Sequence, residues 1–452
     1  MPPNLPPALA AAVAEAARST PDWPFNWPDF PKRTATTSPD PGPAPSRRPN
    51  NRSDDQNRPE NEEEEEEDRA STPSPQPPPT MPPPNPGQGK PQRRIPPAPS
   101  TAPRLTDLTA TPPFHRCTPP MLLGEGPIYR ASDSTLHWFS CLPDTSTTPP
   151  TPPSLHILRV DPLTGRALVR DSHADEEGGN YRVLPLAESV TVAAFRKGRD
   201  KGYVCAYYAG IAWMDEGTGA LEVVREMVGE GERGARRMND GGCDARGRFW
   251  VAEIDLVAAG RYGGMRREGG GSFRERDEGE GEEAKGRLWR FDADGSLHEM
   301  LAGGLVCGNG LAWSPDDGVM YLNDSVRGLV YAFDFDVERG EIANKRVLVD
   351  RRDSYGEPDG MVTDTEGNLW VAVYASDRIM VFSPQGEHLR DVLLPARNPA
   401  CTTWGGKDFD ILYTATGKDR ANESDEKDEG GHMFMFKPGG GVKGFAKHVF
   451  AG

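Results

Sequence analysis

Cysteine is scarce in this chain of 452 residues, and its six cysteines are far apart. They are Cys117, Cys141, Cys205, Cys243, Cys307 and Cys401. No two of them have the CxxC spacing, and no short-spaced group of His and Cys occurs, which argues against a zinc cluster and against a disulfide scaffold. We therefore expect reduced thiols and a cytoplasmic location.

Long apolar runs are also absent from the sequence. No run approaches the roughly 18 residues that indicate a membrane-spanning helix, so we expect no membrane partner. The N-terminal stretch LPPALAAAVAEAARS has no basic start and carries Glu15, which argues against a secretory signal. The strained nucleophile turn GxSxG is missing as well, so the sequence does not indicate a Ser-His-Asp hydrolase.

Positive charge is in short supply after residue 120. The whole chain has a formal net charge of −17, from 52 Lys and Arg against 69 Asp and Glu. Residues 1–120 contain 13 of the basic and 15 of the acidic residues, so the remaining residues carry −15. This excess argues against nucleic acid or an anionic membrane surface as a partner, and it is compatible with a cation site.

The N-terminal region has the composition of a disordered segment. Of the 46 prolines, 32 lie in residues 1–120, which also contain the run EEEEEED at 62–68. Pro, Ser, Thr and runs of like charge cannot bury enough apolar surface to offset the entropy of the chain. We therefore predict a disordered head over residues 1–115, which a protein partner could bind, and one large domain over residues 116–452.

Short strands between Gly, Asp and Pro turns fill the second region, and several resemble one another. The best examples are STLHWFSC (134–141), GRFWVAEI (247–254), GVMYLNDS (318–325), GNLWVAVY (367–374) and DILYTATG (410–417), with KGYVCAYY (201–208) as a looser sixth. Such repeats predict an all-β fold, a six-bladed β-propeller of four-stranded blades. An all-β sandwich does not explain why the pattern recurs. The Gly-rich, charged stretch 260–286 is predicted to be a flexible insertion.

Alignment of these strands places four polar residues at equivalent positions. They are Asn239, Asp359, Asn309 and Glu125, each ten or eleven residues before an equivalent apolar strand position. The innermost strand of a propeller blade starts near the axis, so these side chains are expected to face one another across the channel. Carboxylate and amide oxygens that converge in this way suit a hard divalent cation.

A simpler interpretation is that each of the four residues only forms a turn. Asn-Asp-Gly is ordinary turn material, and any one of the four taken alone would be assigned to a turn. Their common register favours the axial site. We assign Asp240 and Gly241, which follow Asn239, to a turn.

Four segments resemble a known family. They are LLGEGPIY (122–129), RRMNDGGCDARGRFWVAE (236–253), GNGLAWSPDDGVMYLNDS (308–325) and PDGMVTDTEGNLWVAVY (358–374). Over roughly residues 121–450 the chain resembles the SMP-30/gluconolactonase/regucalcin family, whose members are six-bladed propellers with one divalent cation at the axis and hydrolyse sugar lactones and related esters. The resemblance implies this fold and substrate class here, with Ca²⁺, Mg²⁺, Mn²⁺ or Zn²⁺ as the metal.

The resemblance also implies roles for individual residues. Glu125, Asn309 and Asp359 would be the direct metal ligands, and Asp359 would also act as the general base. Arg237 would bind the substrate, and Asn239 would contact the substrate or a metal-bound water.

The sequence does not assign a role to three acidic residues near the expected site, Glu253, Asp255 and Asp324. The family often has a substrate-contacting acid a little beyond the GRFW strand, but neither Glu253 nor Asp255 aligns with it convincingly. Asp324 either supports the metal site or caps the end of its strand.

The sequence therefore leads us to expect a divalent-metal-dependent lactonase, a carboxylic-ester hydrolase. In this hypothesis the cation polarises the lactone carbonyl and Asp359 directs a water onto it. One alternative is an organophosphate-type hydrolase with the same metal site. Another is a non-catalytic calcium-binding or protein-docking propeller, which the disordered head would suit. Arg237 and Asn239 favour catalysis, because they add substrate-binding groups to a minimal ion cage.

Overall fold

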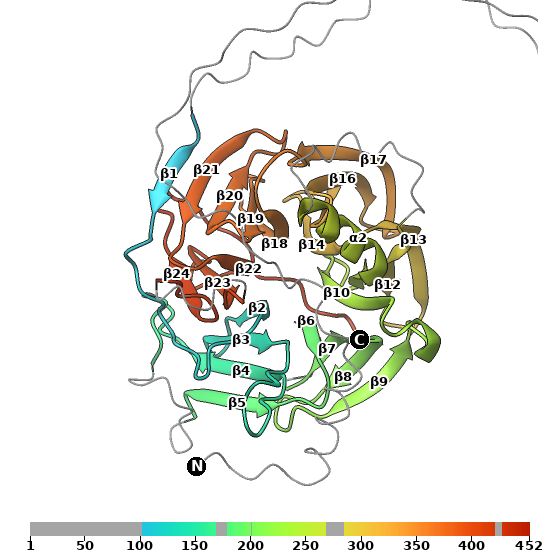
Figure 1. Cartoon of the computed structure of the whole chain (residues 1–452), viewed down its shortest axis with the longest axis horizontal. Helices are drawn as coiled ribbons and strands as arrows, with labels where there is room; N and C mark the ends of the chain where they lie inside the picture. The colour runs from blue at the N-terminus through green and yellow to red at the C-terminus, as the bar shows by residue number, and fades with distance from the viewer. Residues whose placement is uncertain (1–101, 169–178, 200, 268–283, 421–426) are drawn as a thin grey trace, which may run out of the picture. The chain divides into compact units, whose positions relative to one another are not determined.

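The computed structural model describes residues 102–168, 179–199, 201–267, 284–420 and 427–452, with only the backbone for 262–267. Strands dominate these residues and form six separate sheets around one axis (Figure 1). The prediction of an all-β, six-bladed propeller is therefore confirmed. The predicted disorder of residues 1–101 and the predicted flexibility of 268–283 fall outside the described residues.

Each blade begins with an innermost strand at the axis and adds its other strands outward. Blade 1 consists of β2 (Gly124–Arg130), β3 (Thr135–Ser140), β4 (Ser154–Arg159) and β5 (Tyr181–Pro185). Blade 2 consists of β6 (Val190–Phe195), β7 (Tyr203–Tyr207), β8 (Gly210–Met214) and β9 (Leu221–Glu226). Blade 3 consists of β10 (Arg236–Cys243), β11 (Phe249–Asp255), β12 (Gly286–Phe291) and β13 (Leu297–Leu305).

The remaining three blades follow the same order. Blade 4 consists of β14 (Gly308–Trp313), β15 (Val319–Asp324), β16 (Leu329–Asp336) and β17 (Glu341–Asp350). Blade 5 consists of β18 (Glu357–Thr363), β19 (Leu369–Tyr374), β20 (Arg378–Phe382) and β21 (His388–Leu393), with β1 (Arg104–Asp107) added outside β21. Blade 6 consists of β22 (Asn398–Gly405), β23 (Ile411–Gly417) and β24 (Met433–Phe436).

Burial falls from the axis outward within each blade. Every residue of β18 and β22 is buried, whereas β17 is exposed along most of its length. Inner strands pack against neighbouring blades on both faces, so they tolerate little solvent, while the outermost strand has one blade edge in water. The cores that hold the ring together therefore lie between the blades.

A repeated turn links the innermost strand of a blade to the next strand. In blade 3, Asp244 accepts hydrogen bonds from the amides of Arg246 and Arg248 and from Trp250 Nε1, at 3.0, 3.1 and 2.8 Å. In blade 5, Asp364 makes the equivalent bond to Trp370 Nε1 at 2.9 Å. The aspartate thus caps the turn and fixes a tryptophan that is buried between blades. The recurrence of D-x-x-G-x-x-W in the sequence reflects this function.

The N-terminal end of the described chain completes the ring. The amides of Phe114 and His115 donate to Met433 O, and Met433 N donates to His115 O, so this segment covers the outer edge of blade 6. Strand β1 pairs in parallel with β21. Residues 104–115, which the sequence placed in the disordered head, are therefore part of the propeller. Backbone pairing to an edge strand needs no apolar pattern, so composition could not reveal it.

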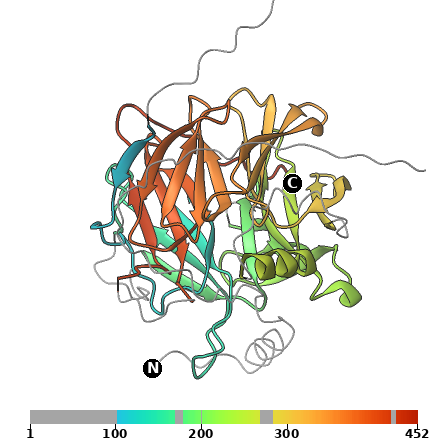
Figure 2. The same cartoon turned by 45° about the horizontal axis from the view of Figure 1, so that its top comes forward.

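Two short helices lie outside the blades among the described residues, η1 (Glu230–Glu232) and α2 (Leu256–Arg267). Helix α2 connects β11 to β12, beside the blades (Figure 2). Its first turns bury Leu256, Ala258 and Ala259. The start of the stretch predicted as a flexible insertion, 260–267, is thus helical, because these apolar residues anchor the helix to the blades. Within the described residues, no helix has the length and apolarity needed to cross a membrane.

Innermost strands all begin at one face of the ring, which we call the upper face. The turns that follow them, such as the one at Asp244, lie at the lower face. Because β11 runs antiparallel to β10, the start of α2 returns to the upper face.

Candidate metal centre

All six innermost strands are interrupted by an irregular step in their pairing at the same level of the ring. The steps lie between Glu125 and Ile128, Val190 and Val192, Met238 and Gly241, Gly308 and Leu311, Pro358 and Met361, and Pro399 and Cys401. A β-bulge leaves an extra residue unpaired, bends the strand and redirects a side chain. The same backbone feature therefore turns one position of each blade toward the axis.

Glycine at the second bulge position allows neighbouring blades to approach closely. A Cβ at Gly310 would lie 2.5 Å from Asp359 O, and a Cβ at Gly360 would lie 2.4 Å from Cys401 Sγ. Contacts this short leave no room for any side chain. The Asn-Gly and Asp-Gly pairs at 309–310 and 359–360 are thus required by packing at the axis.

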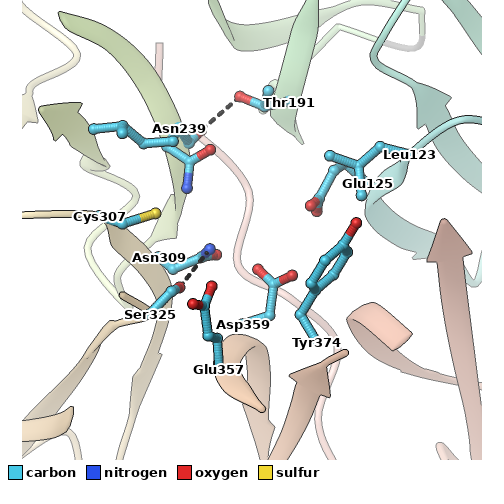
Figure 3. A pocket seen from close by; sticks show the side chains of 11 residues that line it. Leu123, Glu125, Thr191, Asn239, Cys307, Asn309, Ser325, Glu357, Asp359 and Tyr374 are labelled. Carbon is cyan, nitrogen blue, oxygen red and sulfur yellow. Dashed lines mark hydrogen bonds between the residues drawn. The ribbon is translucent and has the colours of Figure 1, made fainter. Parts of the chain in front are cut away.

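The four aligned polar residues meet in one pocket on the axis (Figure 3). Glu125, Asn239, Asn309 and Asp359 come from blades 1, 3, 4 and 5. The other lining residues are Leu123, Thr191, Ile254, Cys307, Ser325, Glu357 and Tyr374. The pocket has about 40 Å³ of water-accessible volume, which is room for an ion and a few water molecules.

Both asparagine side chains are oriented by the protein. Asn239 Nδ2 donates to Gly308 O at 2.9 Å, and Asn309 Nδ2 donates to Ser325 Oγ at 2.9 Å. Ser325 Oγ in turn donates to Pro358 O at 2.7 Å. Asn309 Oδ1 also accepts a hydrogen bond from Gly310 N at 3.0 Å, which leaves one of its lone pairs for a ligand. Since each amide nitrogen is engaged, the amide oxygens are the groups that would face a ligand. Amide oxygens are suitable donors for hard cations.

The carboxylates of the site are buried close to one another. Burial, and then the charge of Asp240, raises the pKa of Glu125 to about 8. Burial also raises the pKa of Asp359 well above its usual range, and the charges of Glu125, Asp240 and Glu357 raise it further. Like charges in a low-dielectric site disfavour ionisation unless a cation compensates them.

The residues present fit a hard divalent cation. Oδ1 of Asp359 is buried without a hydrogen-bond partner among the described residues, and a metal ion would satisfy it. In the described ranges, no three His, Cys, Asp or Glu side chains form a group that could hold a metal ion, so a cation in this pocket would need the amide oxygens as further donors. Burial and neighbouring carboxylates raise the pKa of the Cys307 thiol well above its usual range, which disfavours a thiolate-bound metal.

Asp240 lies in a different place from the one the sequence indicated. The structure places Asp240 and Gly241 inside β10, and the turn comes later, at Asp244. The Asp240 side chain is buried, and its Oδ1 accepts a hydrogen bond from Gly241 N at 2.7 Å. The bulge explains the difference, because an irregular strand step and a turn both favour Asn-Asp-Gly.

Arg237 is buried in β10 but is not among the residues that line the pocket. Its Nη1 donates to Met238 O at 2.9 Å, and its charge interacts with that of Glu125. Its expected contact with a substrate stays a prediction.

The two acids beyond the GRFW strand have structural partners instead. Glu253 accepts hydrogen bonds from Arg287 Nε and Trp289 Nε1, at 3.0 and 2.9 Å. Asp255 accepts one from Ala258 N at 2.8 Å and so caps α2.

Asp324 supports the loop that leads into β14. Its carboxylate accepts hydrogen bonds from Val306 N at 3.1 Å and Cys307 N at 3.0 Å, and it is fully buried. This loop immediately precedes Asn309. Asp324 thus holds the backbone that leads to Asn309, although Asp324 itself does not line the pocket.

Sequence reasoning missed Glu357 and Tyr374, which line the pocket. Glu357 is two residues before Asp359 on β18, so the two side chains share one face of the strand. Tyr374 is paired with Glu357 in the register of β18 and β19. Because alternate residues of a strand face the same side, the position of Glu357 two residues before Asp359 was a sequence signal that could have identified it.

The fold and pocket define a class of protein, the six-bladed propeller with an axial cluster of carboxylates and amides. A family model described as the SMP-30/gluconolactonase/LRE-like region matches residues 123–418. The chain belongs to this family.

Individual relatives agree with this assignment. The chain is 31% identical over 334 residues to regucalcin of Danio rerio, covering 73% of this chain and 95% of that one. It is 27% identical over 336 residues to 6-deoxy-6-sulfogluconolactonase of Pseudomonas putida, covering 74% and 96%. A crystal structure of a calcium-binding regucalcin from Agrobacterium tumefaciens shares the fold, with a TM-score of 0.58, 21% identity and coverage of 77% and 99%.

Proposed function

We propose that this protein is a divalent-metal-dependent hydrolase that opens a sugar lactone or a related ester. The observation that carries the proposal is the axial pocket, where Glu125, Asn309 and Asp359 present oxygen atoms from three blades and Asp359 Oδ1 has no protein partner among the described residues. Relatives named as regucalcin and as a sulfogluconolactonase support the substrate class.

Glu125, Asn309 and Asp359 would hold the cation. When bound, a divalent cation would polarise the lactone carbonyl and keep the surrounding carboxylates ionised. Asn239, fixed by its bond to Gly308 O, would orient the substrate or a water molecule.

Asp359 is the proposed general base. It accepts a proton from the attacking water as the water oxygen bonds to the carbonyl carbon. When the bond from the carbonyl carbon to the ring oxygen breaks, Asp359 returns that proton to the departing oxygen. This transfer regenerates the Asp359 carboxylate, and the product is the open-chain hydroxy acid, whose new carboxylic acid then loses its proton to solvent.

Arg237 is the proposed contact for the hydroxyl or carboxylate groups of the substrate. It lies on β10, two residues before Asn239, and its guanidinium is buried near Glu125. A change of rotamer would be needed for it to reach into the pocket, and substrate binding would have to stabilise that rotamer.

The test is lactone hydrolysis by the purified chain after chelation and after addition of Ca²⁺, Mg²⁺, Mn²⁺ or Zn²⁺ in turn. We expect no turnover with chelator and recovery with at least one cation. Tight cation binding without turnover of any lactone would support a non-catalytic calcium-binding propeller instead. Turnover of a phosphotriester but of no lactone would support the organophosphate-type alternative.

A further inference from the structure

The last residue of β19, Tyr374, brings a phenol into the axial pocket. Its hydroxyl points into the same space as the carboxylates of Glu125 and Asp359, as Figure 3 shows. The body of the side chain packs against a buried apolar cluster. A tyrosine placed in this way has its apolar ring in the core and its polar group in the pocket. The hydroxyl is therefore presented to a ligand that binds at the axis.

The backbone on both sides of Tyr374 is held in place. Tyr374 pairs with Glu357 in the register of β18 and β19. In the turn that follows, Ser376 Oγ donates to Val373 O at 2.7 Å. Ala375 has a φ of 59°, in the left-handed region that a residue with a Cβ rarely adopts, and such a conformation persists only where the surrounding structure imposes it. The end of β19 thus holds the Tyr374 side chain in one direction.

The other hydroxyl and amide donors of the pocket are already engaged. Thr191 Oγ1 donates to Asn239 O at 2.5 Å. The bonds described above engage the amide nitrogens of Asn239 and Asn309 and the hydroxyl of Ser325. The Tyr374 hydroxyl has no hydrogen-bond partner among the described residues. Within the described lining of the pocket, it is therefore the hydroxyl that a ligand can use as a donor.

Lactone hydrolysis needs such a donor at this place. The carbonyl oxygen gains negative charge as water adds to the carbonyl carbon, and the carboxylates of Glu125, Glu357 and Asp359 in the same pocket would repel that charge. A cation would supply positive charge, and an O–H group would add a directed hydrogen bond to the same oxygen. A phenol is suitable because it is neutral near pH 7 and does not compete with the cation for the carboxylates.

We infer that the Tyr374 hydroxyl donates a hydrogen bond to the carbonyl oxygen of the lactone, and that this bond strengthens as the oxygen becomes an oxyanion. The inference rests on the proposed function and adds a catalytic residue to it. An interaction that strengthens toward the transition state raises kcat, whereas one that holds substrate and transition state equally lowers KM. The two kinetic constants therefore distinguish an oxyanion donor from a simple substrate contact.

The test compares Tyr374→Phe, which removes only the hydroxyl, with Tyr413→Phe as the matched control. The Tyr413 hydroxyl donates to Gly165 O at 3.2 Å and does not line the pocket. Kinetics are measured with gluconolactone, or with whichever sugar lactone the parent protein hydrolyses. We expect Tyr374→Phe to lower kcat by about 10- to 100-fold and to change KM by less than about threefold. Tyr413→Phe should keep both constants.

Product binding gives a readout that does not depend on turnover. The carboxylate of the hydroxy acid carries a full negative charge at the position of the former carbonyl oxygen, so its affinity in the presence of the cation should fall by about three- to tenfold in Tyr374→Phe, measured by calorimetry. Ca²⁺ affinity without product should stay within about threefold of the parent value, and the melting temperature within about 2 °C, because the three proposed ligands and the packing of the ring are kept.

Each result decides a separate point. An unchanged kcat, or a rise in KM alone, would overturn the inference and leave the proposed function standing. A loss of Ca²⁺ affinity as large as the loss of kcat would assign Tyr374 to the cation site instead. A reduced kcat with unchanged product affinity would place the hydrogen bond on the departing ring oxygen and overturn the assignment to the carbonyl oxygen. If the parent protein hydrolysed no lactone, the proposed function would fail and the inference with it.

Discussion

Substitution of Gly360 by alanine should disrupt both the packing and the chemistry of the axis. A Cβ there would lie 2.4 Å from Cys401 Sγ and 2.8 Å from Cys401 Cα, and both groups are buried in the innermost strand of blade 6. Relief requires β18 and β22 to move apart, because the Cα cannot rotate away. Overpacking of a core costs about 1–3 kcal/mol of stability, and a clash with the backbone is at the upper end of this range. We therefore expect Gly360→Ala to lower the free energy of unfolding by about 3 kcal/mol.

The same movement would displace Asp359, which immediately precedes Gly360. We therefore expect Ca²⁺ affinity to fall at least tenfold, measured by calorimetry, along with the free energy of unfolding measured by urea denaturation in EDTA. Gly231→Ala is the matched control, because no heavy atom lies within 4 Å of a Cβ at that position, and it should change stability by less than about 0.5 kcal/mol. Adding Cys401→Ala to Gly360→Ala should restore part of the lost stability, because it removes the contact with Sγ but leaves the contact with Cys401 Cα. A Gly360→Ala protein as stable as the parent, with unchanged Ca²⁺ affinity, would refute the close approach of the blades.

Three further predictions concern the site and the ring. Asp359→Asn should lower kcat/KM for lactones at least 100-fold and also weaken Ca²⁺ binding, and activity retained in this variant would exclude Asp359 as the base. In the metal-free protein, the pKa of Glu125 is raised to about 8, above the value near 4.5 expected for the unfolded chain. The folded state then holds an extra proton between these values, so the melting temperature in EDTA should fall as the pH rises from 5 through 8, and Glu125→Gln should reduce this slope. A chain that starts at residue 118 should melt at a lower temperature than one that starts at residue 102, because it lacks β1 and the pairing of His115 with Met433.

The sequence predicted the six blades and the four axial residues because both depend on a repeated pattern. Strands such as GRFWVAEI and GNLWVAVY recur along the sequence, and their alignment places Asn239, Asn309 and Asp359 in register. The structure gives the physical basis of that register, since each innermost strand carries a bulge at the same level.

Features that depend on a single contact could not be predicted in this way. Strand β1 joins blade 5 only through its backbone, and its four residues RLTD show no apolar alternation. Asp240 occurs in a sequence that is equally compatible with a turn. Glu357 has no carboxylate counterpart two residues before the aligned position in any other blade, so the repeat alignment did not identify it, and only the strand period of two before Asp359 pointed to it.

Because the six bulges are equivalent, the side chain at each bulge can be exchanged without a change in the backbone. Blades 2 and 6 carry Thr191 and Ala400 at the bulge, and neither contributes a carboxylate. Since the backbone already aims these positions inward, an exchange of one side chain could add or remove a ligand while every strand kept its place. Within this fold, metal preference and coordination number could thus diverge between relatives by single substitutions, independently of the packing between blades that determines stability.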